Sequence, residues 1–239
     1  MHGIHSPFVF QLEKKCLKDR KIYDRYKDFK NYKKALQKDK SEIIVKDFGD
    51  GSRVFKSNSR KVARIGQVAG ATQKRMQLLY RLSSYFKTAT VLELGTSLGT
   101  ATFAFNPEYV KELNTVEGCP ETAKKAQAFF NQFHYKLPQI SMGIFTEELT
   151  KLSINKFDLI YFDGNHNKEA TLSYVNRLLS TAHNESIWIF DDIHWSAAMT
   201  QAWQEICKLP QITVSIDCFW FGLVFFRKEQ MKQDFFIRI

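Results

Sequence analysis

The sequence predicts an α/β fold, in which a doubly wound, mostly parallel sheet of seven strands carries helices on both faces and ends in an antiparallel hairpin. From Thr88 onward, short β-branched and apolar runs alternate with amphipathic helical stretches, which is typical of parallel βαβ units. A glycine-containing turn at residues 95–99 follows the first of these runs. Only a few residues separate the last two runs, too few for a crossover helix, so these two should pair as a hairpin.

Length and composition agree with this prediction and exclude several other classes. A chain of 239 residues with 44% hydrophobic content can bury the core of one large domain, or of a domain with an appendage. The 4 cysteines form no CxxC pair, so neither a disulfide framework nor a cysteine zinc site is indicated. The chain has no apolar leader, and no run approaches the roughly 18 apolar residues of a membrane span. We therefore expect a soluble, unprocessed, cytoplasmic protein.

The basic charge is concentrated in the N-terminal third of the chain. Residues 1–90 carry 22 Lys and Arg against 8 Asp and Glu, whereas the whole chain has a net charge of +10. We divide the chain into a basic helical extension or cap, residues 1–87, and the main domain, residues 88–239. The extension could contact a polyanion, but a solvated helical face rich in lysine is the preferred interpretation. Aromatic residues spaced three apart give this extension a ridge for packing: Tyr23, Tyr26, Phe29 and Tyr32.

The elements follow in order along the chain. Residues 11–40 are expected to form one or two polar helices, residues 46–60 a loop, and residues 72–86 a further helix. The five parallel strand candidates are Thr90 to Leu94, Leu113 to Glu117, Gln139 to Met142, Phe157 to Phe162 and Ser186 to Phe190. The two hairpin candidates are Ile212 to Cys218 and Gly222 to Arg227.

The segment VLELGTSLGT, residues 91–100, is the most informative part of the sequence. A strand ends at Leu94, and glycines at positions 95 and 99 permit a tight turn and the close approach of a ligand. We expect a helix to begin directly after this turn, with its free N–H groups facing the ligand. The third glycine of a dinucleotide fingerprint is missing near Thr102, which argues against a pyrophosphate site. The candidate ligand-binding residues of the segment are Glu93, Gly95, Thr96, Ser97 and Gly99.

A second candidate lies at the end of the next strand. Glu117 follows Gly95 by 22 residues, where a carboxylate can accept hydrogen bonds from ribose hydroxyls. Gly118 and Cys119 would then border an adenine, and Phe145 would form either another wall of that pocket or part of the core. The spacing therefore suits an adenosine-containing ligand.

Two clusters that combine acidic residues with histidine follow the fourth and fifth strands. One is the run DGNHNK, which begins at Asp163, and the other is DDIHW, which begins at Asp191. Ligands bind beyond the carboxyl ends of the strands in sheets of this kind, so both clusters should lie at one site. An Asp at such a place can also cap a helix, and Asp192 could do that for a helix beginning near Ser196.

From about residue 60 to the end, the chain resembles the class I S-adenosylmethionine-dependent methyltransferases, in particular the small-molecule O-methyltransferases related to catechol O-methyltransferase. VLELGTSLGT, TVEGCPETAKKA, FDLIYFDGNHNKEA and IFDD carry the resemblance. It implies a Rossmann-like fold and S-adenosylmethionine as the cofactor, bound by the residues named above together with Asp163. In metal-dependent members, residues equivalent to Asp163, Asp191 and Asp192 hold a divalent ion, here Mg²⁺ or Ca²⁺. Asp192 stands where that family usually has Asn, and His166 stands where it has its Lys base.

Methyl transfer to an oxygen also needs a base whenever the acceptor must lose a proton. His166 is the preferred candidate and His194 the second, because an imidazole titrates near neutral pH, and Asp163 lies beside His166 in sequence. Lys168 could replace either histidine. The segment MHGIHSPFVF at the N-terminus is expected to pack near the acceptor pocket, with a dimer contact as the alternative, and the loop at residues 46–60 to act as a lid or a linker.

The sequence thus predicts a methyltransferase that acts on an oxygen of a small-molecule acceptor. An RNA methyltransferase that uses the basic extension for ribose or tRNA remains open, as does a non-catalytic cofactor-binding scaffold. A homodimer is a further open prediction.

Overall fold

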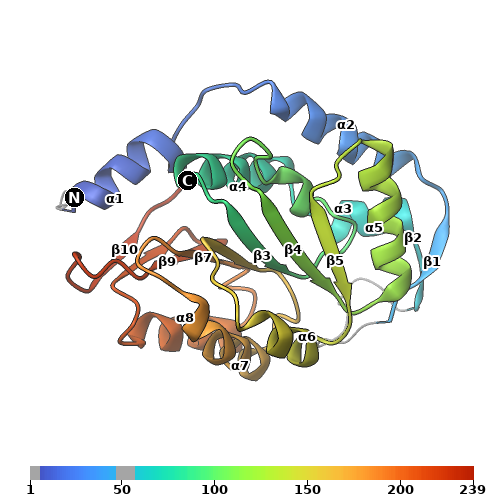
Figure 1. Cartoon of the computed structure of the whole chain (residues 1–239). Coiled ribbons are helices and arrows are strands. Elements are labelled where there is room, and N and C mark those ends of the chain that lie inside the picture. The colour runs from blue at the N-terminus through green and yellow to red at the C-terminus, as the bar shows by residue number, and fades with distance from the viewer. Residues whose placement is uncertain (1–5, 47–56) are drawn as a thin grey trace.

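The structure is a computed structural model, and it describes residues 6–46 and 57–239. A central sheet lies between two layers of helices (Figure 1). Within the described residues the sheet has eight strands in the order β10-β8-β9-β7-β6-β3-β4-β5. Their bounds are β3 Thr90–Leu94, β4 Glu112–Glu117, β5 Pro138–Met142, β6 Leu159–Phe162, β7 Ile187–Asp191, β8 Val214–Asp217, β9 Phe221–Phe225 and β10 Gln233–Phe236.

The five strands β3 to β7 are mutually parallel, and β9 pairs antiparallel with both β7 and β8. The predicted α/β fold with a parallel sheet and a C-terminal hairpin is therefore confirmed. The predicted seven strands are one too few, because β10 adds to β8 as a parallel edge strand. Its residues are mostly exposed and lie in a polar context, so they lack the apolar run by which the other strands were recognised.

Helices cover both faces of the sheet. α2 Arg25–Lys38, α3 Val62–Val68, α4 Gln73–Tyr85 and α5 Pro120–Gln132 lie on one face, and α6 Phe145–Leu152, α7 Lys168–Leu178 and α8 Ala197–Lys208 lie on the other (Figure 1). Successive residues of a strand point to opposite faces of the sheet. Val91 and Tyr161 therefore pack with the first set of helices, and Leu92 and Phe162 pack with the second. The apolar core is therefore split by the sheet into two halves.

Local sequence signals set the helix starts near the site. Thr72, Asn167 and Ser196 each cap a helix by accepting a hydrogen bond from a backbone N–H in its first turn, for α4, α7 and α8 respectively. Because Ser196 is the cap of α8, Asp192 does not have the capping role that the sequence left open. α5 begins with Pro120, whose fixed φ suits the first helical position.

The N-terminal part of the chain is built into the same core as the sheet. Val9 and Leu12 of α1 (Pro7–Leu12), Cys16 of the following π-helix (Glu13–Leu17), and Phe29 and Tyr32 of α2 are buried. The predicted aromatic ridge packs against Tyr80 and Phe103. The division at residue 87 stays a prediction, but the residues before it share one apolar cluster with the sheet.

One expectation for the N-terminal third needs correction, and another falls mostly outside the described residues. Phe8 contacts Phe225, which pairs with Ile187 at the amino end of β7, so the described part of MHGIHSPFVF lies away from the predicted acceptor edge. A small antiparallel hairpin, β1 Glu42–Ile44 with β2 Ser59–Lys61, flanks the predicted loop. Most of that loop, residues 47–56, lies outside the described residues, as does the start of the chain at residues 1–5.

Candidate functional site

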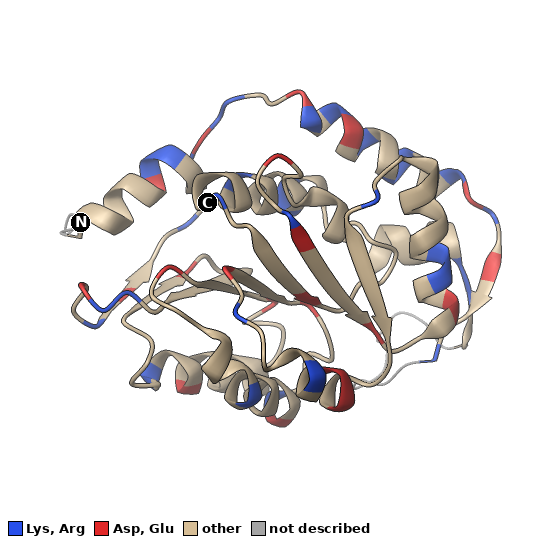
Figure 2. Cartoon of the chain, viewed as in Figure 1, with Lys and Arg blue, Asp and Glu red and all other residues tan. Residues whose placement is uncertain are grey.

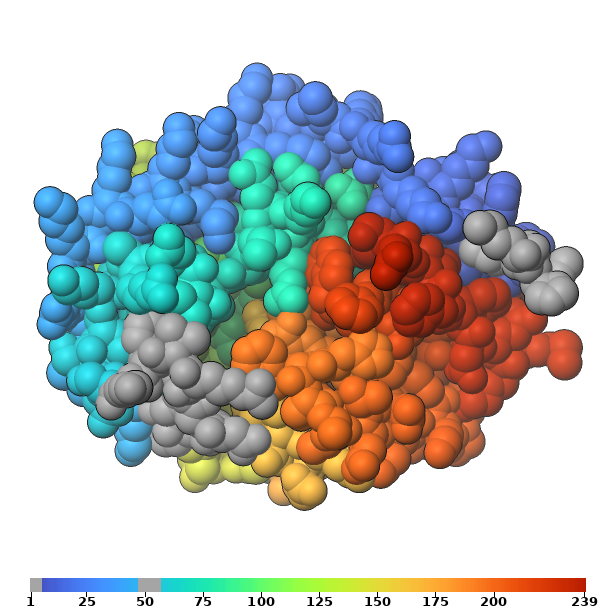
Figure 3. Space-filling model, turned by 180° about the vertical axis from the view of Figure 1, so that it is seen from behind, coloured from blue at the N-terminus to red at the C-terminus, as the bar shows by residue number. Residues whose placement is uncertain are grey.

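The candidate site lies where the strand order reverses. β3, the first strand of the large sheet in sequence, has β4 on one side and β6 on the other, so the loops after β3 and β6 diverge there. Open α/β sheets bind ligands in the crevice at such a switch point. Seen from behind, green atoms lie recessed between the cyan and orange parts of the chain (Figure 3). This crevice brings together the ends of β3, β4, β6 and β7, as the sequence predicts.

The glycine turn after β3 needs both of its glycines. Gly95 has φ +103°, and a Cβ there would lie 2.2 Å from the carbonyl oxygen of Asp163, in the loop after β6. Gly99 has φ +73°, and a Cβ there would lie 2.4 Å from the ring of Phe130. Non-glycine residues rarely adopt such φ values, and neither position leaves room for a Cβ atom. The chain then enters only a 3-10 turn, Thr102–Ala104, in place of the predicted helix.

Glu117 connects this turn to the end of β4. One carboxylate oxygen accepts a hydrogen bond from the Ser97 N–H at 2.8 Å, and the other accepts one from the Cys119 N–H at 2.8 Å. A carboxylate at this place is of the chemical kind that accepts hydrogen bonds from ribose hydroxyls. The residues present therefore fit the ribose of an adenosine-containing cofactor. Gly118 lies between Glu117 and Cys119 in the chain, at the turn into α5.

Glu93 and Thr96 lie beneath the turn and not on its surface. Glu93 is completely buried, and one of its oxygens accepts hydrogen bonds from Thr102 at 2.5 Å and from Thr115 at 2.6 Å. Burial raises the pKa of Glu93 to about 8, and the nearby charge of Glu117 acts in the same direction. Thr96 is also buried, with its hydroxyl 2.6 Å from that of Thr115. Both residues therefore support the turn from below.

The two predicted walls of the adenine pocket have different surroundings. The Sγ of Cys119 accepts a hydrogen bond from the Lys46 N–H at 3.3 Å, which brings the end of the β1–β2 hairpin to this edge. Phe145 packs on Tyr174, with ring centroids 5.5 Å apart, and against Gly164, where a Cβ would lie 2.5 Å from the ring. Phe145 therefore belongs at least in part to the core, the alternative that the sequence left open.

Asp163 and His166 are together in the loop after β6. The Nε2 of His166 lies 3.9 Å from a carboxylate oxygen of Asp163, and the His166 ring centroid is 6.3 Å from that of Trp195. Trp195 itself is 47% exposed. Burial and the charges of Asp191 and Asp192 raise the pKa of Asp163 well above its ordinary value. An imidazole, a carboxyl and an exposed indole thus face one another at this end of the crevice.

Arg75, a residue that sequence reasoning missed, holds the loop after β7. Its two terminal nitrogens donate to Asp191 Oδ2 at 2.8 Å and to Asp192 Oδ1 at 2.6 Å. Burial alone would lower the pKa of Arg75, but the two carboxylates outweigh it and raise that pKa overall. Tyr161 also donates to Asp191 Oδ2, at 2.9 Å. The only sequence signal for Arg75 is its place in the first turn of α4, 116 residues from its partner.

The expected metal site does not fit these residues. A hard divalent cation needs about six oxygen ligands, and the described part of the chain contains no group of three or more His, Cys, Asp or Glu placed to hold a metal. The oxygens of Asp191 are already engaged by Arg75, Tyr161 and the Asp192 N–H. We therefore derive no step through a metal.

The second candidate base, His194, is held by hydrogen bonds at both ring nitrogens. Nε2 lies 2.8 Å from Asp217 and Nδ1 lies 3.1 Å from the Thr200 hydroxyl. Lys168 forms an ion pair with Glu205 of α8 at 2.7 Å. His166 therefore stays the preferred candidate.

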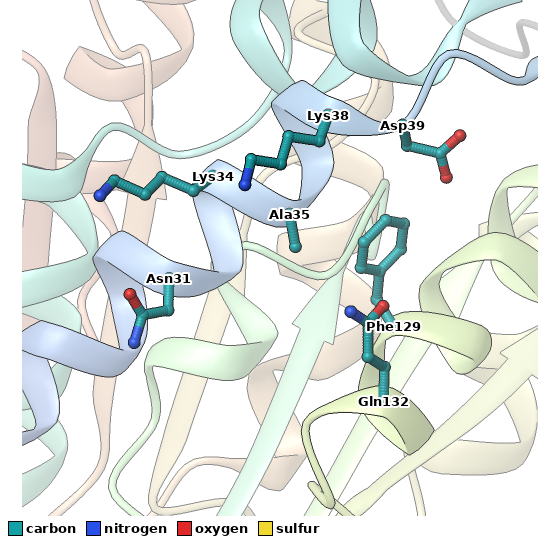
Figure 4. Close-up of a pocket in the computed structure, with 7 residues that line it drawn as sticks. All are labelled: Asn31, Lys34, Ala35, Lys38, Asp39, Phe129 and Gln132. Carbon is teal, nitrogen blue, oxygen red and sulfur yellow. The ribbon is translucent and has the colours of Figure 1, made fainter.

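The charged surface of the N-terminal third lies elsewhere on the molecule. Lys and Arg are frequent along α2 (Figure 2). A pocket of about 520 Å³ lies between α2 and α5, and Lys34 and Lys38 extend along it (Figure 4). Other cations of α2 have local partners, such as Arg25 with Asp28 and Lys27 with Asp24. This pattern favours the solvated helical face.

Comparison with known structures identifies the fold class. An SAH-bound methyltransferase from Podospora anserina matches with TM-score 0.62 at 14% identity, over 95% of this chain and 99% of that one. The SAM complex of the O-methyltransferase TomG from Streptomyces achromogenes matches with TM-score 0.57 at 15% identity, over 92% and 95%. An O-methyltransferase from Bacillus cereus in complex with SAH matches with TM-score 0.58 at 11% identity, over 91% and 96%. The chain has the class I methyltransferase fold.

The sequence match is more local. Residues 92–193, which include the loops after β3, β4, β6 and β7, match the family model of a methyltransferase domain. No curated protein sequence matches. In the part of the chain that the structure describes, no helix is both long and apolar enough to cross a membrane.

Proposed function

We propose that this protein is an S-adenosylmethionine-dependent methyltransferase that methylates an oxygen of a small-molecule acceptor. The observation that carries the proposal is the connection of Glu117 to the glycine turn, through the 2.8 Å hydrogen bond from Ser97. This bond supports a ribose-binding role for Glu117, because the carboxylate lies beside a turn whose glycines let a ligand approach the backbone. The named neighbours, complexes with SAM or SAH among them, support the same cofactor.

The chain's own residues divide the work between two parts of the crevice. Glu117, the Gly95–Gly99 turn and Cys119 hold the adenosine end, supported from below by Glu93 and Thr96. The cofactor supplies an electrophilic methyl group when bound. Bringing the acceptor oxygen into line with that methyl group accounts for much of the rate.

His166 accepts the acceptor's proton in this proposal, with Asp163 beside it. The Asp163 carboxyl lies 3.9 Å from Nε2 of His166, at the same end of the crevice. The exposed indole of Trp195 offers the acceptor an apolar surface. With the 4 cysteines free, a cytoplasmic location belongs to the proposal, and a homodimer remains a prediction.

Calorimetric titration with S-adenosylmethionine and S-adenosylhomocysteine tests the proposal. Wild type should bind both, and Glu117→Gln should weaken binding about 10- to 100-fold, because a hydrogen bond to a charged group contributes roughly 1.5–3 kcal/mol. Glu121→Gln is the matched control, since Glu121 is exposed on α5 and pairs only with Lys124 among the described residues. If wild type bound neither compound, the protein would be a scaffold without the cofactor.

Two further measurements separate the remaining alternatives. The log of kcat should rise with pH through a single step in wild type, and His166→Gln should remove that step while lowering kcat about 100-fold. An RNA methyltransferase would instead bind RNA with an affinity that falls steeply as salt increases. We expect a shallow dependence, because a solvated helical face is the preferred interpretation of α2 and two of its cations, Arg25 and Lys27, pair with neighbouring aspartates.

A further inference from the structure

We infer that the guanidinium of Arg75 takes the place of a divalent cation at the Asp191–Asp192 turn, so that this end of the site works without a metal ion. Arg75 is a positioning residue in this inference, because it acts through the two carboxylates. The inference rests on the proposed function for its account of the site. Its central test, cation binding, does not.

The geometry is that of a guanidinium spanning two carboxylates. One terminal nitrogen lies 2.8 Å from Asp191 and the other 2.6 Å from Asp192, both short, charge-assisted contacts. Two parallel donors on a rigid planar group fix the separation of the two carboxylates, much as an ion between them would. The guanidinium carbon also lies 5.4 Å from the ring of Trp220 and 5.7 Å from that of Phe221.

The surroundings engage both carboxylate oxygens of Asp191. Its side chain is 2% exposed, one oxygen accepts from Arg75 and Tyr161, and the other accepts from the Asp192 N–H. A cation entering between the carboxylates would have to displace Arg75 and leave a mostly buried guanidinium without its partners. Removing one partner of a buried pair is strongly destabilising. The arginine and an ion are therefore mutually exclusive here.

The fold holds Arg75 in this position from both sides. The side chain of Thr72 caps α4 by accepting a hydrogen bond from the backbone N–H of Arg75, which anchors the arginine in the first helical turn. On the opposite side, Asp192 has φ +52° and its N–H donates to the Trp220 carbonyl at 2.9 Å. Asp192 thus adopts an unusual backbone conformation that is fixed by the β9 side and by Arg75 together. The chain from this turn leads directly to Trp195.

Manganese titration of the full chain tests the inference. Free Mn²⁺ is followed by electron paramagnetic resonance, and the melting temperature is recorded with and without Mn²⁺. Wild type should show no stoichiometric Mn²⁺ binding up to about 1 mM and no rise in melting temperature. Arg75→Ala should melt lower than wild type and regain several degrees when Mn²⁺ is added, because two close carboxylates are then left without a cation.

Matched variants make the result specific. Arg64→Ala removes an exposed arginine bonded to Gln67 on α3 and should behave as wild type. The melting temperature of Arg75→Lys should lie between those of wild type and Arg75→Ala and should not change with Mn²⁺. An ammonium supplies the positive charge but not the two parallel donors of a guanidinium. Stoichiometric Mn²⁺ binding by wild type that Asp192→Asn abolishes would overturn the inference. So would a folded Arg75→Ala protein that shows no response to Mn²⁺.

The same samples separate this inference from the proposed function. Titration with S-adenosylhomocysteine in the presence of a chelator should give the same affinity as in Mg²⁺. If wild type bound no S-adenosylhomocysteine, the proposed function would fail while the Mn²⁺ result still stood. If Arg75→Ala did not fold, the wild-type and Asp192→Asn titrations would decide.

Discussion

The two halves of the crevice are built in different ways. In the cofactor half, formed by the loops after β3 and β4, backbone amides and glycines form the main contacts, and the central contact joins Ser97 and Glu117, which are 20 residues apart. In the acceptor half, formed by the loops after β6 and β7, side-chain charges dominate, and the central contact joins residues 116 apart. Backbone geometry set by short segments is readable from sequence, whereas charge pairing between distant elements is not.

Gly95→Ala should have the largest effect and tests whether the two halves are joined at this residue. Its Cβ would lie 2.2 Å from the backbone oxygen of Asp163 at φ +103°, so strain and overpacking of roughly 1–3 kcal/mol each are expected. Binding of S-adenosylhomocysteine should fall more than about 100-fold. Melting temperature and calorimetry measure both effects.

Gly143→Ala is the matched control for that variant. Its Cβ would meet the flexible end of the Glu148 side chain at 2.9 Å and no backbone atom at that distance. We expect it to bind S-adenosylhomocysteine as wild type does. Equal affinity in Gly95→Ala and wild type would show that the halves do not meet at Gly95.

Glu93→Gln should alter how stability depends on pH, and it tests the buried support of the cofactor half. The pKa of Glu93 is raised to about 8 in the folded protein, mainly by burial, so the folded state keeps a proton that the unfolded chain releases above about pH 4.5. Glu93 should therefore contribute a decrease in the free energy of unfolding as pH rises from about 4.5 to 8, of at most roughly 4–5 kcal/mol, which then levels off.

Urea unfolding at several pH values measures this dependence. Glu93→Gln should flatten the decrease, because the amide does not titrate. Glu147→Gln, an exposed substitution on α6, should leave the curve unchanged. A wild-type protein whose stability increased over that range would contradict the burial argument.

His194→Gln should have the smallest effect on turnover, and it distinguishes the role of His194 from that of His166 in the acceptor half. Because both ring nitrogens of His194 are bonded, to Asp217 and Thr200, we expect a loss of about 1 kcal/mol in stability and a kcat within roughly threefold of wild type. Steady-state kinetics beside His166→Gln gives the comparison. A larger loss of kcat in the His194 variant would reverse the assignment.

Sequence reasoning reached most of the sheet because apolar periodicity and spacing carry that information. It found the five parallel strands, the terminal hairpin and the turn with Gly95 and Gly99, which follow from local rules of conformation. It missed β10, whose polar residues gain their order from pairing with β8. It also expected a metal at Asp191 and Asp192, because the motif shows two carboxylates but not the arginine that arrives from α4.

The packing of α1 against the C-terminal part of the chain also bears on how the chain folds. Ser6, at the start of α1, lies 3.3 Å from Gln230, and the Phe8 ring rests against Phe225 and under Arg227. α1 therefore gains these contacts only after more than two hundred further residues have been made. Contacts of such long sequence separation slow folding and leave apolar surface exposed meanwhile. Premature termination near residue 220 would thus leave α1 without its contacts to Phe225, Arg227 and Gln230, although most of the crevice residues had already been synthesised.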